Sequence, residues 1–121
     1  MATAHILVIE DDPGTQLILE HLLQEAGFKV IIAEHGIAAL ETLQTIKPDL
    51  ILTDLMMPKL GGIGLIQRIR RMEGLAGVPI IALTGYGDSL SAAVMAAGAT
   101  LLLRKPEDMP DLVETINQLL A

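Results

Sequence analysis

The chain alternates five short apolar runs with longer segments in which apolar residues recur at helical spacing. The runs are rich in Val, Ile and Leu, which is typical of strands that are covered on both faces. Glycine, proline and acidic residues separate the two kinds of segment. The pattern predicts strands over residues 6–9, 28–33, 49–54, 78–84 and 101–103.

Five helices are predicted between and after these strands. The first begins with Asp12 at the N-cap and Pro13 at the first helical position, and it ends at Gly27. Lys47 precedes a proline and therefore ends the second helix. The fourth, over 89–97, consists of small residues and is closed by a glycine. The apolar residues that recur at helical spacing are Leu17, Ile18, Leu22 and Leu23 in the first helix, Ala39, Leu40, Leu43 and Ile46 in the second (36–46), Leu65, Ile66 and Ile69 in the third (64–72), and Leu112, Val113, Ile116, Leu119 and Leu120 in the last.

The fivefold alternation of strand and helix predicts an α/β fold, with a five-stranded parallel sheet and helices on both of its faces. A length of 121 residues suits one domain over residues 1–121. Hydrophobic residues make up 51% of the chain and aromatic residues 2%, so the core is expected to be aliphatic.

The net charge of −7 argues against direct binding of nucleic acid, which normally requires a basic face. Arg68, Arg70 and Arg71 form one basic cluster, which we interpret as a solvated helix face with ion pairs to nearby acids. No run of about 18 apolar residues indicates a membrane span, and the first residues lack the pattern of a secretion signal. We therefore expect a cytoplasmic protein, and the absence of cysteine, which excludes a disulfide framework and a thiolate metal site, is compatible with that location.

Reactive side chains stand at the ends of four of the predicted strands, namely Asp11, Asp12, Asp54, Thr84 and Lys105. Each has an ordinary explanation alone, as a helix cap, a turn residue or a solvated strand end. In an open α/β sheet, however, ligands bind just beyond the carboxyl ends of the strands. Two carboxylates about 4 Å apart repel by on the order of 4 kcal/mol at an effective dielectric constant near 20. A divalent cation relieves that repulsion, and an oxygen-rich site suits Mg²⁺.

This combination of side chains is what phosphoryl transfer needs. A carboxylate can act as the nucleophile, a metal neutralises phosphoryl oxygens, and fixed donors hold the remaining charge. The chain also resembles, from Ile6 to about Leu120, the receiver domain of two-component response regulators. The strings that carry the resemblance are Val8-Ile9-Glu10-Asp11-Asp12, Pro48-Asp49-Leu50-Ile51-Leu52-Thr53-Asp54-Leu55-Met56-Met57-Pro58, Ala82-Leu83-Thr84-Gly85, Gly98-Ala99 and Lys105-Pro106.

The resemblance implies the strand order 2-1-3-4-5 and a role for each site residue. Asp54 would accept a phosphoryl group from a phosphohistidine of a sensor histidine kinase or a histidine phosphotransfer protein. Asp12 and Asp54 would bind Mg²⁺ directly, Met56 would add its backbone carbonyl, and Asp11 would act through a bound water. The two residues that would contact phosphoryl oxygens are Thr84 and Lys105, the latter often followed by a cis proline in that family.

The chain departs from the family pattern at several positions. Leu102 stands three residues before the lysine, where the family usually has Tyr or Phe, so the usual aromatic switch is absent. Gly61 stands where an Asp is frequent. Gly85 leaves access to the predicted pocket open, whereas Tyr86 either shields it or is a partly exposed turn aromatic.

Three functions compete at this point. The first is a phosphorylation-controlled signalling module that binds a downstream effector protein through the face of the fourth helix, fifth strand and fifth helix. The second is a phosphorylation-independent scaffold of the same shape, which Leu102 favours. The third is a metal-dependent phosphatase, which is disfavoured because such enzymes typically place a second Asp where this chain has Met56.

Overall fold

Five parallel strands form a single sheet in the order β2-β1-β3-β4-β5. The computed structural model describes residues 3–56, 60–85 and 90–121. The predicted fold class and the strand order implied by the resemblance are both confirmed. The strands are β1 (His5–Ile9), β2 (Lys29–Ala33), β3 (Leu50–Asp54), β4 (Ile80–Thr84) and β5 (Leu101–Arg104).

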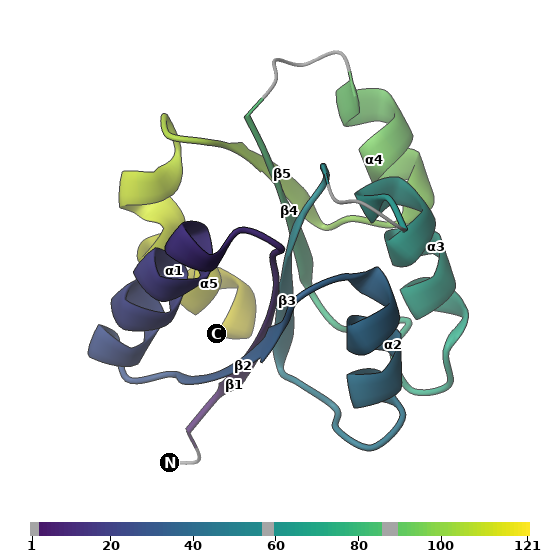
Figure 1. Cartoon of the computed structure of the whole chain (residues 1–121), viewed down its shortest axis with the longest axis horizontal. Helices are drawn as coiled ribbons and strands as arrows, with labels where there is room; N and C mark the ends of the chain where they lie inside the picture. The colour runs from purple at the N-terminus through teal and green to yellow at the C-terminus, as the bar shows by residue number, and fades with distance from the viewer. Residues whose placement is uncertain (1–2, 57–59, 86–89) are drawn as a thin grey trace.

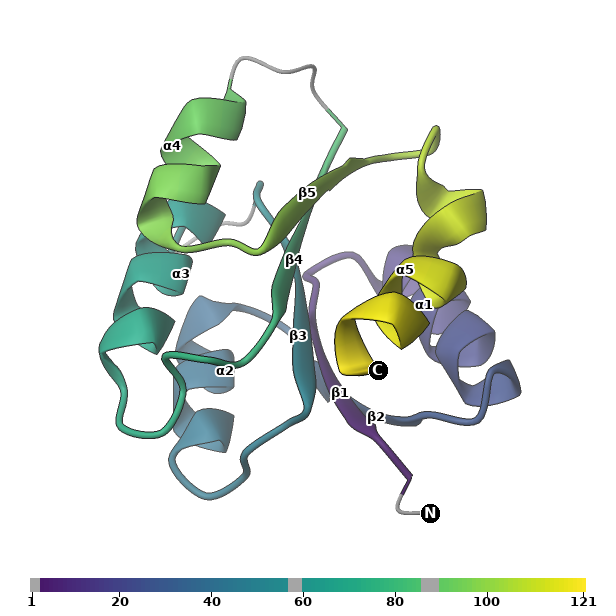
Figure 2. The same ribbon diagram turned by 180° about the vertical axis from the view of Figure 1, so that it is seen from behind.

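The helices cover both faces of the sheet, with α1 and α5 on one face and α2, α3 and α4 on the other, as Figures 1 and 2 show. The fourth helix was predicted from residue 89, which lies outside the described residues. No described helix has the length and apolar character needed to span a bilayer. The helices are α1 (Pro13–Glu25), α2 (Gly36–Leu43), α3 (Gly62–Arg71), α4 (Ser91–Ala97) and α5 (Leu112–Leu120), and a 3-10 turn over Met109–Asp111 precedes α5.

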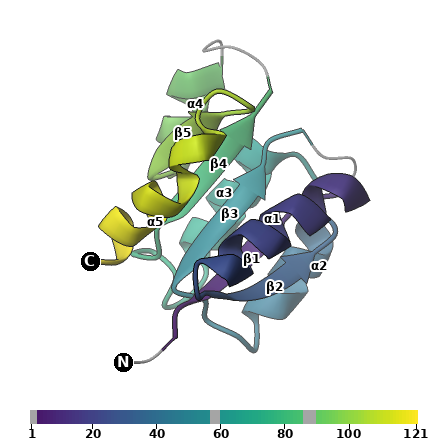
Figure 3. The same cartoon turned by 90° about the vertical axis from the view of Figure 1, so that its left-hand side faces the viewer.

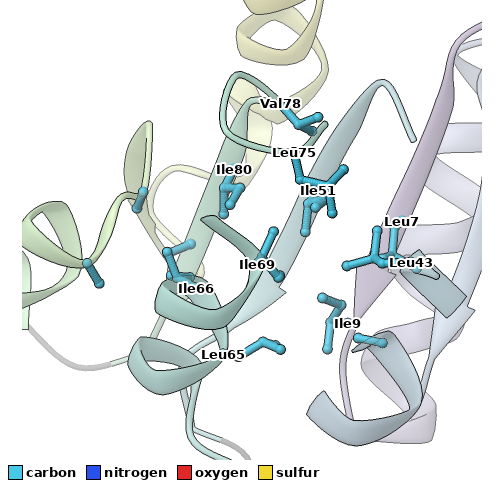
Figure 4. Packing of buried hydrophobic residues seen from close by; sticks show 14 of the residues in the cluster. Leu7, Ile9, Leu43, Ile51, Leu65, Ile66, Ile69, Leu75, Val78 and Ile80 are labelled. Atoms are coloured by element: carbon cyan, nitrogen blue, oxygen red, sulfur yellow. The ribbon is translucent and has the colours of Figure 1, made fainter. Parts of the chain in front are cut away.

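Each face of the sheet has its own apolar layer. Alternate residues of a strand point to opposite faces, so Ile6 and Val8 of β1 join the layer beneath α1 and α5, whereas Leu7 and Ile9 join the layer beneath the other three helices. Figure 4 shows the second layer, in which the buried residues of α3 lie against the central strands. The core is aliphatic, as its composition predicts.

The register of the strands brings their carboxyl ends to one edge of the sheet. Ile9 of β1 pairs with Thr53 of β3, and Asp54 pairs with Leu83 of β4. The residues that follow β1, β3, β4 and β5 therefore lie at the same edge, which Figure 3 shows from the side of α1 and α5.

Helix α1 begins as predicted but presents a different face to the sheet. Asp12 is the N-cap, and its side chain accepts a hydrogen bond from the Thr15 backbone. Leu19 and Leu23 are buried, whereas Leu17 and Ile18 are 67% and 66% exposed. Including Leu17 and Ile18 in the apolar face was wrong, because four apolar residues occur within residues 17–22 and helical spacing alone does not select among them.

Helix α2 is shorter than predicted, and α3 begins earlier. Helix α2 ends at Leu43. The backbone N–H groups of Gln44 and Thr45 donate to carbonyls three residues earlier, which is the pattern of a 3-10 turn and not of an α-helix. Ile46 therefore lies outside the helix and is 39% exposed. Helix α3 starts at Gly62, two residues before the predicted start.

The Arg70 side chain contradicts the interpretation of the three arginines as a solvated ion-paired face. Its guanidinium is half-buried and donates to backbone carbonyls from the loop before β4 and from the end of α4. Three of these bonds satisfy partly buried carbonyls, for which the loss of a hydrogen bond is costly. The acceptors are the carbonyls of Gly98 at 2.8 Å, Leu75 at 3.0 Å, Ala76 at 3.2 Å and Val78 at 2.6 Å.

Gly98 is required at the end of α4 for two reasons. Its φ of +119° lies in the left-handed region, which side chains disfavour. A Cβ at this position would also lie 2.7 Å from Cγ of Arg70. The guanidinium therefore reaches the Gly98 carbonyl because that residue has no side chain.

Replacing Arg70 by Met removes these donors while keeping an apolar stem. We expect the free energy of unfolding to fall by about 2–3 kcal/mol, since hydrogen bonds from a charged group contribute about 1.5–3 kcal/mol each and the surface carbonyls regain water. Urea denaturation measures the loss. The control is Arg71→Met on the same helix, where the side chain is exposed. Equal stability of the two variants would contradict this account.

Candidate functional site

Glu10 follows β1 and carries a carboxylate into the interior. Its backbone N–H donates to the Ala33 carbonyl at 3.1 Å, which extends the β1–β2 ladder by one residue. The side chain is only 2% exposed. Its Oε2 accepts the Asp12 backbone N–H at 3.2 Å, whereas Oε1 is buried without a hydrogen-bond partner in the described part of the chain.

Three carboxylates meet at this edge of the sheet. Within the described residues, Glu10, Asp11 and Asp54 each place an oxygen so that all three atoms lie within 4.8 Å of one another. Asp54 ends β3 and is 7% exposed, whereas Asp11 is exposed. Two of the three predicted acids are thus brought together, and the third member of the cluster is Glu10.

Asp12 is not part of this carboxylate cluster. Its Oδ2 accepts two hydrogen bonds from Thr15, one from the backbone N–H and one from the hydroxyl, both at 2.8 Å. These bonds lower the pKa of Asp12. The side chain serves the first turn of α1, so the cap predicted for Asp12 is found and Glu10 occupies the place among the acids that was predicted for Asp12.

Sequence reasoning missed Glu10 because it took Asp11 and Asp12 as the acidic pair that follows the first strand. The sequence does contain an indication of this role. The buried run ends at Ile9, and Glu10, the first acid after it, still continues the ladder, so its side chain is carried inward. A pair of adjacent acids was expected, and the pair is displaced by one residue toward the strand.

Lys105 places its ammonium between the two buried carboxylates. Its Nζ lies 3.5 Å from Oε1 of Glu10 and 3.5 Å from Oδ1 of Asp54. Its backbone N–H donates to the Thr84 carbonyl at 2.7 Å, which extends the β4–β5 ladder. The Lys105–Pro106 peptide is cis, as the resemblance implied. Lys105 is thus brought to the acids as expected.

Thr84 and Met56 lie at the same edge as the acids. Thr84 ends β4 and is 1% exposed. The Met56 backbone N–H points to Oδ1 of Asp54 at 3.5 Å, and the Met56 side chain is 52% exposed. Gly85 is exposed, and among the described residues beyond its chain neighbours no atom lies within 4 Å of a Cβ built there, whereas Tyr86 lies outside the described residues.

The loop after Asp54 is packed tightly against the start of α3. The Gly62 N–H donates to the Leu55 carbonyl at 3.1 Å. A Cβ on Gly62 would lie 2.6 Å from Cα of Leu55 and 2.9 Å from the Asp54 carbonyl oxygen. A glycine at this position therefore lets the first turn of α3 support the backbone that carries Asp54. Gly61 is the N-cap of α3 and forms no side-chain hydrogen bond.

The electrostatics of the site favour a cation. Three carboxylates and one ammonium leave a formal charge of about −2 when all are ionised. Burial, followed by the charge of Asp54, raises the pKa of Glu10 to about 7, although Lys105 and the Asp12 N–H act in the opposite direction.

The donor set fits a hard divalent cation such as Mg²⁺. All of its side-chain donors are carboxylate oxygens, which Mg²⁺ prefers. Among the described residues, the buried Oε1 of Glu10 has the Lys105 ammonium at 3.5 Å but no hydrogen bond, so a cation or its bound water would supply a closer partner. The exposed side of Asp11 leaves room for the water molecules that Mg²⁺ retains.

Comparison with known proteins identifies the family. The model of the response regulator receiver domain matches residues 6–117, so the chain belongs to this family of two-component signalling proteins. Receiver domains are signalling modules that interact with histidine kinases and downstream effectors, and they are not conventional enzymes. The family binds Mg²⁺ at an acidic pocket of the kind described above.

Relatives of known sequence include both short and long proteins. The chain is 36% identical over 118 residues to RpaA, a DNA-binding transcriptional regulator of Synechocystis. The match covers 95% of this chain and 48% of RpaA. It covers 26% of GlrR, a transcriptional regulatory protein of Escherichia coli that is also 36% identical. The chain thus spans half or less of these two relatives. A 14.6 kDa protein of Leptolyngbya boryana is 34% identical and is covered over 91% of its length.

Solved structures of receiver domains have the same fold. The chemotaxis response regulator CheY4 of Vibrio cholerae superposes with a TM-score of 0.91 at 28% identity, covering 98% of this chain and 99% of CheY4. The receiver domain of the sensor histidine kinase PA1611 of Pseudomonas aeruginosa has a TM-score of 0.90 at 31% identity, with 98% of each chain covered. That structure holds a magnesium ion in its active-site cleft.

The raised pKa of Glu10 predicts a pH dependence of stability in the metal-free protein. A carboxyl group whose pKa is higher in the folded state contributes stability that is fully present below its ordinary pKa of 4.5, and that is lost as pH rises through about 7. Glu10→Gln removes this contribution. The variant should therefore gain stability relative to the wild type as pH rises from 5 to 8, measured by urea denaturation in EDTA. Parallel pH profiles for the two proteins would contradict the assignment.

Proposed function

We propose that this receiver domain accepts a phosphoryl group on Asp54 from a phosphohistidine, in a reaction that requires Mg²⁺, and that phosphorylation changes its binding to an effector protein. The donor would be a sensor histidine kinase or a histidine phosphotransfer protein. The observation that carries the proposal is the position of Asp54, with Lys105 at 3.5 Å and two further carboxylates within 4.8 Å. We also propose that the protein acts in the cytoplasm.

Asp54 is the nucleophile in this proposal. A carboxylate oxygen forms a bond to phosphorus while the bond between phosphorus and the histidine nitrogen of the donor breaks. The electron pair of that bond stays on the imidazole nitrogen, which is protonated from solvent. The product on this chain is an acyl phosphate. The neighbouring Met56 N–H, which points to Oδ1 of Asp54, orients the carboxylate that attacks.

Lys105 supplies positive charge to the phosphoryl oxygens. Its ammonium pairs with Asp54 before reaction, and formation of the acyl phosphate removes the charge of that carboxylate while bringing about −2 charges on the phosphoryl group. The ammonium therefore has a stronger partner after transfer than before. Thr84, at the end of the next strand, would donate its hydroxyl to another phosphoryl oxygen.

Mg²⁺ would be held by Asp11 and Asp54 with the backbone carbonyl of Met56, and Glu10 would complete the acidic pocket directly or through water. When bound, the ion neutralises phosphoryl oxygens. We assign Glu10 in place of Asp12, because Asp12 is engaged by Thr15. Asp12 in this proposal caps α1 and does not bind the metal.

The second candidate function is a receiver-like scaffold that binds its partner without phosphate. Leu102 favours this candidate, because its side chain is partly buried and packs against the layer beneath α2, α3 and α4. An aromatic residue in the family moves at this place, whereas Leu102 has no ring to exchange. Equal affinity of an effector for the wild type and for Asp54→Ala, in the presence of a phosphodonor, would favour the scaffold.

The proposal predicts covalent phosphorylation of Asp54. Incubation with Mg²⁺ and phosphoramidate should add one phosphoryl group, detected by intact mass, which hydroxylamine removes because an acyl phosphate is labile to this nucleophile. EDTA and Asp54→Asn should each abolish the gain. Asp49→Asn provides a matched control, since Asp49 is an exposed acid beside the opposite end of the same strand. Failure of the wild type to gain the group would contradict the proposal.

Lys105 is predicted to affect metal binding and phosphorylation in opposite directions. In Lys105→Met, the acids lose their competing ammonium, so the affinity for Mg²⁺ should rise several-fold. Phosphorylation at saturating Mg²⁺ should slow by on the order of 100-fold, because a fixed donor to the developing charge is missing. Calorimetry and the rate of mass gain measure the two effects. Weaker Mg²⁺ binding by this variant would show that the ammonium does not compete with the ion.

A further inference from the structure

Gln16 on the first turns of α1 contacts the backbone of the acidic loop. Its Nε2 donates to the carbonyl oxygen of Glu10 at 2.6 Å, and the side chain is half-buried. The Gln16 backbone N–H donates to the Asp12 carbonyl at 2.9 Å, so the helix already fixes the position from which the side chain reaches back. This contact is not used by any step of the proposed reaction.

The carbonyl that Gln16 holds belongs to the peptide between Glu10 and Asp11. A peptide is planar, so holding its C=O group restrains the two dihedral angles on either side of it, ψ of Glu10 and φ of Asp11. Both of these residues belong to the carboxylate cluster, one buried and one exposed. A change in either angle would move the exposed Asp11 carboxylate relative to the buried carboxylates of Glu10 and Asp54. Gln16 thus restrains the position of Asp11 relative to the two buried members of the cluster.

We propose that Gln16 is a positioning residue for the divalent cation, acting through the Glu10–Asp11 peptide. The inference rests on the proposed function, because it needs the acidic cluster to bind Mg²⁺. Gln16 does not ligate the ion in this scheme. It holds the peptide in the orientation in which the carboxylates converge. This reduces the conformational entropy that would otherwise be lost when the cation binds.

The fold itself does not depend on this hydrogen bond. The loop is fixed on one side by the bond from the Glu10 N–H to Ala33 and on the other by the Asp12 cap on Thr15. Between these two attachments, the Asp12 N–H donates to Oε2 of Glu10 at 3.2 Å, whereas the Glu10 carbonyl is held by Gln16. Removing the Gln16 donor should therefore weaken metal binding and leave the free energy of unfolding of the metal-free protein nearly unchanged.

The test compares three variants of the full chain. Gln16→Met keeps the length of the side chain and removes the donor. Gln16→Lys restores a long donor, although it adds a positive charge that by itself would disfavour a cation. Gln24→Met is the matched control, because Gln24 is exposed on the same helix. Calorimetry with MgCl₂ measures affinity, and urea denaturation in EDTA measures stability.

We expect Gln16→Met to bind Mg²⁺ about 10-fold more weakly than the wild type, the lower end of the effect seen for groups that orient metal ligands. Gln16→Lys should bind more tightly than Gln16→Met despite its charge, and Gln24→Met should match the wild type. The stabilities in EDTA should agree among all four proteins.

Three outcomes would overturn the inference while leaving the proposed function in place. In the first, the wild type and Gln16→Met bind Mg²⁺ equally. In the second, Gln16→Met loses stability in EDTA or fails to fold, which would assign the residue a structural role. In the third, Gln16→Lys binds no better than Gln16→Met, so the donor is not what matters. If the wild type itself takes up no Mg²⁺, the proposed function fails and this inference fails with it.

Discussion

The mutual repulsion of three carboxylates, offset by a single ammonium, is the constraint on which this site depends. Parallel strands in register bring their ends to one edge, so Glu10 and Asp54 are held close together by the sheet and cannot move apart. Lys105, which follows β5, offsets part of this repulsion. The pocket is thus an unfavourable arrangement of charge in the metal-free protein, and the folding energy that maintains it comes from elsewhere in the molecule.

That energy comes from two aliphatic layers that the site does not share. The central strands are buried on both faces, and the buried apolar residues of the sheet are Ile, Leu, Val and Ala, with no aromatic ring among them. Tight backbone contacts complete the support at the site itself. Gly62 lets α3 approach the residues after Asp54, and Gln16 and Asp12 hold the loop after β1. Chemical function and stability are therefore carried by different residues.

Most of the architecture could be predicted from the sequence, because alternating apolar runs and helical spacing report directly on burial. The errors have a common physical origin. Helical spacing does not choose between Leu17 and Leu19, and a run of acids does not reveal whether Asp12 or Glu10 points inward, since one residue of phase decides each case. The role of Arg70 was hidden for another reason, because its partners are backbone carbonyls, which a sequence does not distinguish.

The contact between Arg70 and Gly98 has a mechanical consequence for α4. The guanidinium connects Gly98, the residue that follows this helix, to the loop before β4, at the amino ends of β4 and β5. The other end of α4 lies toward the carboxyl end of β4 (Figure 1), which is Thr84. With one end anchored, a displacement that starts at the other end of α4 becomes a tilt about Gly98 instead of a translation of the whole helix. Arg70 would thereby act as a pivot for α4.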